Sequence, residues 1–261
     1  MSEKSEKPTP KPIRFNRVLP YLAVLQADLH QTLLSWVYRV WVLLSVVVAV
    51  GYFLYRVGAY REAGMIQTTG EVMSDLVRWV VLGSVTLIIV LTAGCISSER
   101  GTLADSVLSR GVSRHQYFLA KWHSRLLSVL GTFFLIGSLV LLGSFYVLRD
   151  GKLTLAGSVL ALAQVGALLI VVVTASVTVS AIVNSTLLGV AMVWMLLYGV
   201  GFGLSFLPET FPSPDRTLGG LSEVLKGTQD WKMITEFFVW TTGVSLLLAV
   251  GGLSYFSQRD V

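Results

Sequence analysis

The chain has 261 residues, of which 54% are hydrophobic and 13% are charged, and its mean hydropathy is +0.71. Soluble domains average about 25% charged residues, so this composition excludes an ordinary soluble domain and indicates an integral membrane protein in a lipid bilayer. The formal net charge of +5 is interpreted as a topology signal, and no nucleic-acid partner is expected. The single cysteine, Cys95, excludes an intrachain disulfide.

The N-terminal region changes character near residue 18. Residues 1–17 combine Lys, Glu, Pro and Ser with almost no apolar side chains, which predicts a disordered tail without a signal peptide. A helix is then expected from Pro20, in which four leucines recur at steps of three or four residues: Leu22, Leu25, Leu29 and Leu33, interspersed with Gln26, Asp28, His30 and Gln31. This pattern predicts an amphipathic helix in the membrane interface. A polar extension of the first spanning helix remains the alternative.

Apolar stretches long enough to cross a bilayer follow, since about 20 residues span its hydrocarbon core. The six predicted spans cover about 37–55, 78–96, 126–148, 158–183, 186–206 and 236–256. Asn184 and Ser185 leave room only for a tight turn between the fourth and fifth spans. The polar segment 207–235 is expected to hold a short helix at 221–226. Residues 18–261 are therefore predicted to form an all-α, polytopic transmembrane domain.

Six spans place both termini on one face of the membrane. Lys and Arg number eleven in the segments on the face of the termini and seven in those on the other face. Basic segments resist translocation, so both termini are predicted to be cytoplasmic and the protein to lie in the inner (cytoplasmic) cell membrane.

The segment 97–125 is the longest strongly polar stretch between two spans. Thr102 and Asp105 have the spacing of a capping box, and Gly111 suits the left-handed position after a helix. Ser113 and Gln116 repeat the capping-box spacing, which predicts the start of a long helix entering the membrane. A short helix is therefore expected at about 103–109, before a helix of more than 30 residues.

This short helix is predicted to be amphipathic, as is typical of a docking helix at a membrane surface. One side carries Leu103, Val107 and Leu108, and the other carries Asp105, Ser106 and Ser109. A well-capped cytoplasmic loop without a docking role would show the same capping signals.

Sequence motifs for catalysis or metal binding are not recognised. Gly151-Lys152 is followed by Leu153, where a P-loop needs Ser or Thr, so ATP hydrolysis by this chain is not expected. No metal-ligand spacing is seen, and no catalytic, cofactor-binding or metal residues are assigned. No Asp, Glu, Lys or His is expected deep inside a span, which disfavours an ion-coupled carrier or an intramembrane enzyme. Small residues in the later spans favour close helix packing.

The segment 99–122 resembles the cytoplasmic loop in the membrane subunits of type-2 ABC exporters. In those proteins an acidic residue and Gly-Thr-Leu precede an apolar helix, a Ser-x-Pro-Val-Ser-Arg turn, an aromatic residue and a Lys. The matching residues are Glu99, Gly101, Thr102, Leu103, Leu108, Ser109, Val112, Ser113, Arg114, Tyr117 and Lys121. Gly111 departs from the pattern, since a Pro is common there. The layout of the spans looks closest to that of short permeases found beside copper-enzyme maturation systems.

The resemblance implies the permease subunit of an ATP-driven ABC transporter, an exporter by family analogy. It would pair with a second copy or a relative and couple to a separate ABC ATPase subunit, so the chain itself would not be an enzyme. Leu103, Val107 and Leu108 would fill a groove on the ATPase. Glu99 and Arg100 would orient the helix. The remaining coupling residues would be Gly101, Thr102, Asp105, Gly111, Ser113 and Arg114. A non-transporting scaffold or assembly subunit, and a channel or carrier, remain alternatives, and the substrate is not indicated.

Overall fold

The structure of the chain is a computed structural model that describes residues 18–63, 69–99, 112–147, 153–206 and 213–258. All regular structure in these ranges is helical, which confirms the all-α prediction. The helices long and apolar enough to span a membrane are α2 (Trp36–Ala63), α3 (Thr69–Ala93), α5 (Arg114–Val147), α6 (Leu155–Ile182), α7 (Thr186–Ser205) and α10 (Trp231–Gln258). The shorter elements are α1 (Leu19–Leu34), the 3₁₀ turn η1 (Ser97–Glu99), α8 (Pro214–Gly219) and α9 (Leu221–Lys226).

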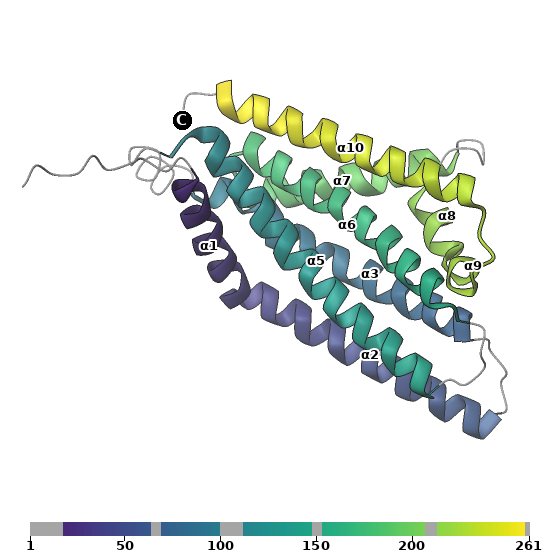
Figure 1. Cartoon of the computed structure of the whole chain (residues 1–261). Helices are drawn as coiled ribbons and strands as arrows, with labels where there is room; N and C mark the ends of the chain where they lie inside the picture. The colour runs from purple at the N-terminus through teal and green to yellow at the C-terminus, as the bar shows by residue number, and fades with distance from the viewer. Residues whose placement is uncertain (1–17, 64–68, 100–111, 148–152, 207–212, 259–261) are drawn as a thin grey trace, which may run out of the picture.

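Helix α6 lies at the centre of the bundle and packs against α3, α5, α7, α9 and α10 (Figure 1). In its most apolar window 72% of the residues are buried, against 17% in α2 and 11% in α7. The outer helices therefore expose their apolar side chains, as expected for surfaces that contact lipid. The chain is a multi-pass membrane protein.

The alternating hydroxyl residues of α6 all have hydrogen-bond partners, and three of the four bond to neighbouring elements. Thr174 accepts from Trp122 Nε1 of α5, and Thr178 donates to Leu248 O of α10. Ser180 accepts from the N–H groups of Ile96 and Ser97. Ser176 donates to Val172 O in its own helix. These residues join α6 to three sides of the bundle. Their function here is packing, as small polar residues provide in membrane helices.

The first helix of the chain is separate from the first spanning helix. Ser35 is extended (φ −64°, ψ 145°), which ends α1, and its Oγ accepts from the N–H of Tyr38 at 3.2 Å, which caps the start of α2. Figure 1 shows the sharp bend at this point, with α1 lying against α5. The predicted break is confirmed, and a continuous extension of the spanning helix is wrong.

The two ends of the bundle differ. Helix α1 and the end of α10 lie at one end, and α8 and α9 lie at the other (Figure 1). The tight turn at 184–185 and the short helix at 221–226 are as predicted, whereas α8 was not predicted. Helix α9 docks closely on α6, where Thr154 N–H donates to Leu225 O at 3.1 Å. Gly157 permits this approach, since a Cβ there would lie 2.2 Å from Val224 O.

The spans extend beyond their predicted limits at several ends. Helix α3 begins at Thr69 and α10 at Trp231, whereas the sequence placed these spans at 78–96 and 236–256. Their first turns contain polar and charged residues, which hydropathy excludes from a span although they continue the helix.

Candidate functional site: a buried ion-pair cluster

The start of α5 has the geometry that the sequence predicts. The N–H of Ser113 donates to Gln116 Oε1 at 3.1 Å, and the N–H of Gln116 donates to Ser113 Oγ at 3.2 Å. This reciprocal pair is a capping box, and it begins a helix of 34 residues at Arg114. Arg114 Nη1 also donates to Ser257 O at 3.3 Å, which ties the start of α5 to the end of α10.

Helix α1 turns a polar residue toward the bundle. Asp28 is 2% exposed and lies on the face that packs against α5, one turn before the buried Thr32. Leu22 and Leu33, which the sequence placed on the apolar stripe, are 50% and 40% exposed. The predicted leucine stripe is therefore split, since Leu25 and Leu29 are half-buried, and the Asp28 carboxylate is enclosed within the protein.

Two cations of α5 meet this carboxylate. Lys121 Nζ lies 2.6 Å from Asp28 Oδ1 and 2.5 Å from Glu99 Oε1 of η1. Arg125 Nη2 lies 3.2 Å from the same Asp28 oxygen. The four side chains are between 1% and 14% exposed, and their formal charges cancel. We call Asp28, Glu99, Lys121 and Arg125 the charge cluster.

Further contacts hold the charge cluster in place. The hydroxyl of Tyr117 donates to Glu99 Oε2 at 2.6 Å, and the Tyr117 ring centroid lies 5.6 Å from Lys121 Nζ. Arg125 Nη1 donates to Leu91 O of α3 at 3.2 Å. Each charge therefore has a short contact to an opposite charge, but Asp28 Oδ2 and Arg125 Nε are buried without a hydrogen-bond partner in the described part of the chain. The ion pairs thus offset only part of the cost of removing these charges from water.

The charge cluster joins α1, η1 and α5, which are distant in the sequence. Since the ions are buried, separating them would leave unpaired charge in a poorly solvated place, at a cost of about 3–5 kcal/mol where a charge loses its last acidic partner. Glu99 is the last described residue before the segment 100–111, and Ser113 lies just beyond that segment. Glu99 and Ser113, which flank this segment, therefore both lie at the same end of α5, the end at which α1 lies.

The predicted coupling residues are only partly described by the structure. Glu99, Ser113 and Arg114 lie together at the α1 end of the bundle, opposite α8 and α9 (Figure 1). The predicted helix at 103–109 lies outside the described residues. So do the other coupling residues, Arg100, Gly101, Thr102, Leu103, Asp105, Val107, Leu108 and Gly111.

The histidines provide no metal centre in the described part of the chain. His123 Nδ1 lies 3.0 Å from the Tyr21 hydroxyl, and His30 and His115 are exposed. Among the residues that the structure describes, no three His, Cys, Asp or Glu side chains come close enough to hold a metal ion.

Sequence reasoning missed the burial of the charge cluster. It counted Lys121 and Arg125 as loop cations, whereas the structure buries both beneath α1. The four residues lie outside the predicted spans, so the expectation of no Asp, Glu, Lys or His deep inside a span is not contradicted. A signal was present: the two cations are four residues apart, so they share one face of a helix, and Tyr117 shares that face. Two buried cations on one face require acidic partners from elsewhere.

A comparison of the chain with protein-family models and with curated proteins gave no match. Function must therefore be inferred from the residues of this chain, and the charge cluster is the most distinctive arrangement among those described.

Proposed function

We propose that this chain is the permease subunit of an ATP-driven ABC transporter and that the segment 100–111 couples it to a separate ATPase subunit. The observation that carries the proposal is the contact of Glu99 with both Tyr117 and Lys121. All three occupy positions of the exporter loop motif, and Tyr117 and Lys121 follow Glu99 by 18 and 22 residues. A motif whose members meet in space is stronger support than a motif of spacing alone.

The geometry also supports a mechanical role for this end of the protein. A partner that pushes on the segment 100–111 would act on η1 through Glu99 and on α5 through Ser113. Because the buried ion pairs resist separation, α1, η1 and α5 would move together. A force applied at the membrane surface would thus be transmitted to the spanning helices, because the charge cluster would not come apart.

The proposal includes sidedness and partners. The α1 end would face the cytoplasm across the inner membrane, and two permease copies, or one copy and a relative, would each bind an ATPase subunit. Lys121 and Arg125 are buried and paired, so the topology prediction rests on the other nine basic residues of that face against seven on the opposite face. Transport would be powered by the partner, and export follows from the family resemblance.

The test is affinity purification of the tagged protein from native membranes. The wild-type protein is expected to bring an ATP-binding subunit with it. Replacing Leu103 and Leu108 with Asp should abolish this association, because two charges would enter the apolar groove, while leaving the membrane level unchanged. The matched control is Ser106→Asp with Ser109→Asp, which adds the same charge on the other side of the predicted helix and should retain the ATPase.

Each result decides between functions. Unaltered association in the leucine double variant rejects the docking role. A purified wild-type complex with no ATP-binding subunit favours the alternative, a non-transporting scaffold or assembly subunit. Transport in vesicles that proceeds without ATP favours a channel or carrier.

A further inference from the structure

A lateral groove opens between α2 and α5 within their spanning segments. Its volume is about 270 Å³, and Val46, Val50 and Phe53 of α2 face Leu139 and Gly143 of α5 across it. All of its lining residues are apolar. The α2 part lies inside the membrane-spanning stretch Trp36–Tyr55, so the groove opens toward the lipid rather than toward water.

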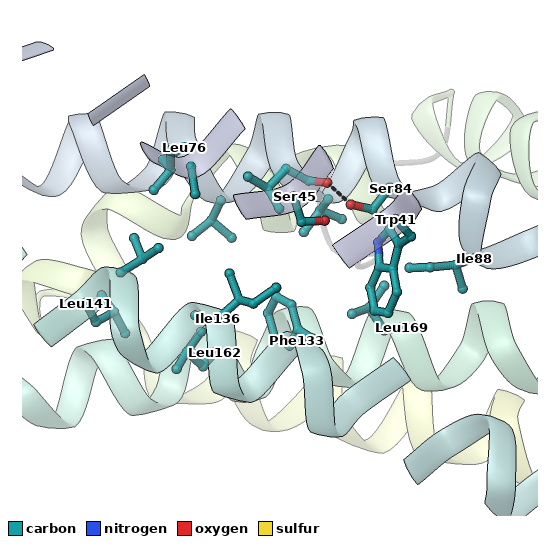
Figure 2. A pocket seen from close by; sticks show the side chains of 16 residues that line it. Trp41, Ser45, Leu76, Ser84, Ile88, Phe133, Ile136, Leu141, Leu162 and Leu169 are labelled. Atoms are coloured by element: carbon teal, nitrogen blue, oxygen red, sulfur yellow. Dashed lines mark hydrogen bonds between the residues drawn. The ribbon is translucent and has the colours of Figure 1, made fainter. Parts of the chain in front are cut away.

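A cavity of about 40 Å³ lies next to the groove, inside the bundle between α2, α3, α5 and α6. Three residues line both spaces: Ala49, Ile136 and Val140. Figure 2 shows the cavity, with Leu76 and Leu141 toward one end and Trp41 toward the other. No charged side chain lines either space among the described residues.

The Trp41 end of the cavity contains hydrogen-bonding groups without partners. Trp41 Nε1 and Ser45 Oγ are buried, with each residue 3% exposed, and neither forms a hydrogen bond within the described chain. They are one turn apart on α2, and Figure 2 shows both beside Ser84 of α3, whose hydroxyl donates to Val80 O. A buried donor without an acceptor is costly, so these two groups point to a polar atom of a ligand.

We propose that the groove and cavity bind a fatty acyl chain that ends in a neutral carbonyl group. The carbonyl oxygen accepts hydrogen bonds from Trp41 Nε1 and Ser45 Oγ, and the chain lies along the apolar lining to the mouth between α2 and α5. The carbonyl is neutral because no cation is present to balance a carboxylate. From Ser45 to Leu54 the groove side of α2 rises about 13 Å, a length suited to a hydrocarbon chain.

The route of entry agrees with this ligand class. An acyl compound dissolved in the bilayer reaches the mouth without crossing water, and its methylene groups exchange lipid contacts for groove contacts. A water molecule could satisfy the two polar groups, but it would leave the apolar groove unexplained. The site does not depend on the proposed ATPase coupling, since none of its lining residues belongs to the segment 97–125.

The test uses the purified full-length protein in detergent and three photoreactive probes. The first is a long-chain fatty acid methyl ester with a diazirine in its chain, the second is the ether that lacks its carbonyl, and the third is a phosphatidylcholine with the same acyl chain. Mass spectrometry of the digested protein locates the adducts. We expect adducts concentrated on the groove residues of α2 and α5, with the ester about two- to tenfold more efficient than the ether, as one net hydrogen bond implies.

Adducts from the methyl ester without matching phosphatidylcholine adducts would support the site, because a free neutral ester can place its carbonyl beside Trp41 and Ser45. Phosphatidylcholine adducts at the same residues would overturn this placement, because a charged headgroup has no room or counter-charge at the enclosed end of the cavity. Adducts spread evenly over all lipid-facing helices, or equal labelling by ester and ether, would overturn it.

Variants make the test specific. Val50→Trp narrows the mouth, at a residue that is 52% exposed, and should reduce groove labelling at least fivefold. Trp41→Phe keeps an aromatic ring but removes one of the two donors, and should reduce the preference for ester over ether. The control Val47→Phe adds bulk at a 60% exposed residue of α2 outside the groove and should change nothing. Unchanged labelling in Val50→Trp, with an unchanged thermal midpoint, contradicts the proposal.

The test of the acyl-chain site is independent of the test of ATPase coupling. The variant with Leu103 and Leu108 replaced by Asp should keep the full groove labelling whether or not it loses an ATPase.

Discussion

Asp28→Asn tests the charge cluster most directly, since it keeps the size of the side chain and removes one charge. Lys121, whose side chain is 4% exposed, would keep Glu99, whereas Arg125, at 9%, would lose the carboxylate that it contacts. Removing one partner of a buried ion pair costs about 3–5 kcal/mol, because the remaining charge loses its partner without regaining water. For a protein of about this size that loss lowers the unfolding midpoint by roughly 6–20 °C.

Two further variants show whether charge balance is the cause. Glu99→Gln should cost less, about 1–3 kcal/mol, since its amide oxygen still accepts from Tyr117 and Lys121 keeps Asp28 at 2.6 Å. Asp28→Asn combined with Arg125→Gln restores neutrality. Its destabilisation should fall short of the sum of the two single variants by at least about 1 kcal/mol.

The measurement is unfolding of the purified protein in mixed micelles by added dodecyl sulfate, followed by tryptophan fluorescence, together with the thermal midpoint. An Asp28→Asn protein within about 0.5 kcal/mol of the wild type would refute the electrostatic reasoning. So would a double variant whose loss equals the sum of the singles, because that result means the two charges do not interact.

Two other predictions concern packing on α6, and the same unfolding assay checks both. Ser180→Ala removes the acceptor of two buried N–H groups that follow α3, and should lower the free energy of unfolding by about 1–3 kcal/mol. The control Ser176→Ala breaks only a bond within α6 and should lower it by less than about 1 kcal/mol. Gly157→Ala places a Cβ 2.2 Å from a carbonyl oxygen of α9 and should lower the free energy of unfolding by about 1–3 kcal/mol. The control Gly131→Ala meets nothing within 4 Å and should show no loss of stability. Equal effects within either pair would contradict the packing described.

The elements of the fold were largely predictable because hydropathy and capping are local properties. The long apolar runs gave the spanning helices, Ser113 and Gln116 gave the start of α5, and Asn184 marked the turn between α6 and α7. Helix ends such as Thr69 were missed because charged first turns resemble loops in composition. The boundary of a span and the boundary of a helix are different physical quantities.

The candidate site was predictable only in part, because its contacts join distant segments. Glu99, Tyr117 and Lys121 could be associated through the loop motif, but Asp28 lies 93 residues before Lys121. The pattern of α1 predicts an amphipathic helix without indicating which side will meet α5. The groove between α2 and α5 was not predicted either, since a gap between helices depends on tertiary packing rather than on the order of residues.

The extended residue Ser35 has a consequence for motion. Before it, α1 is tied to α5 by ion pairs; after it, α2 packs chiefly on α3, where Tyr52 donates to Asp75. Near the beginning of α2, the Tyr38 hydroxyl lies 2.6 Å from Thr132 Oγ1 of α5. Because the helix is interrupted at Ser35, α1 and α2 need not move as one rigid rod: ion pairs hold α1 to α5, whereas packing on α3 holds α2.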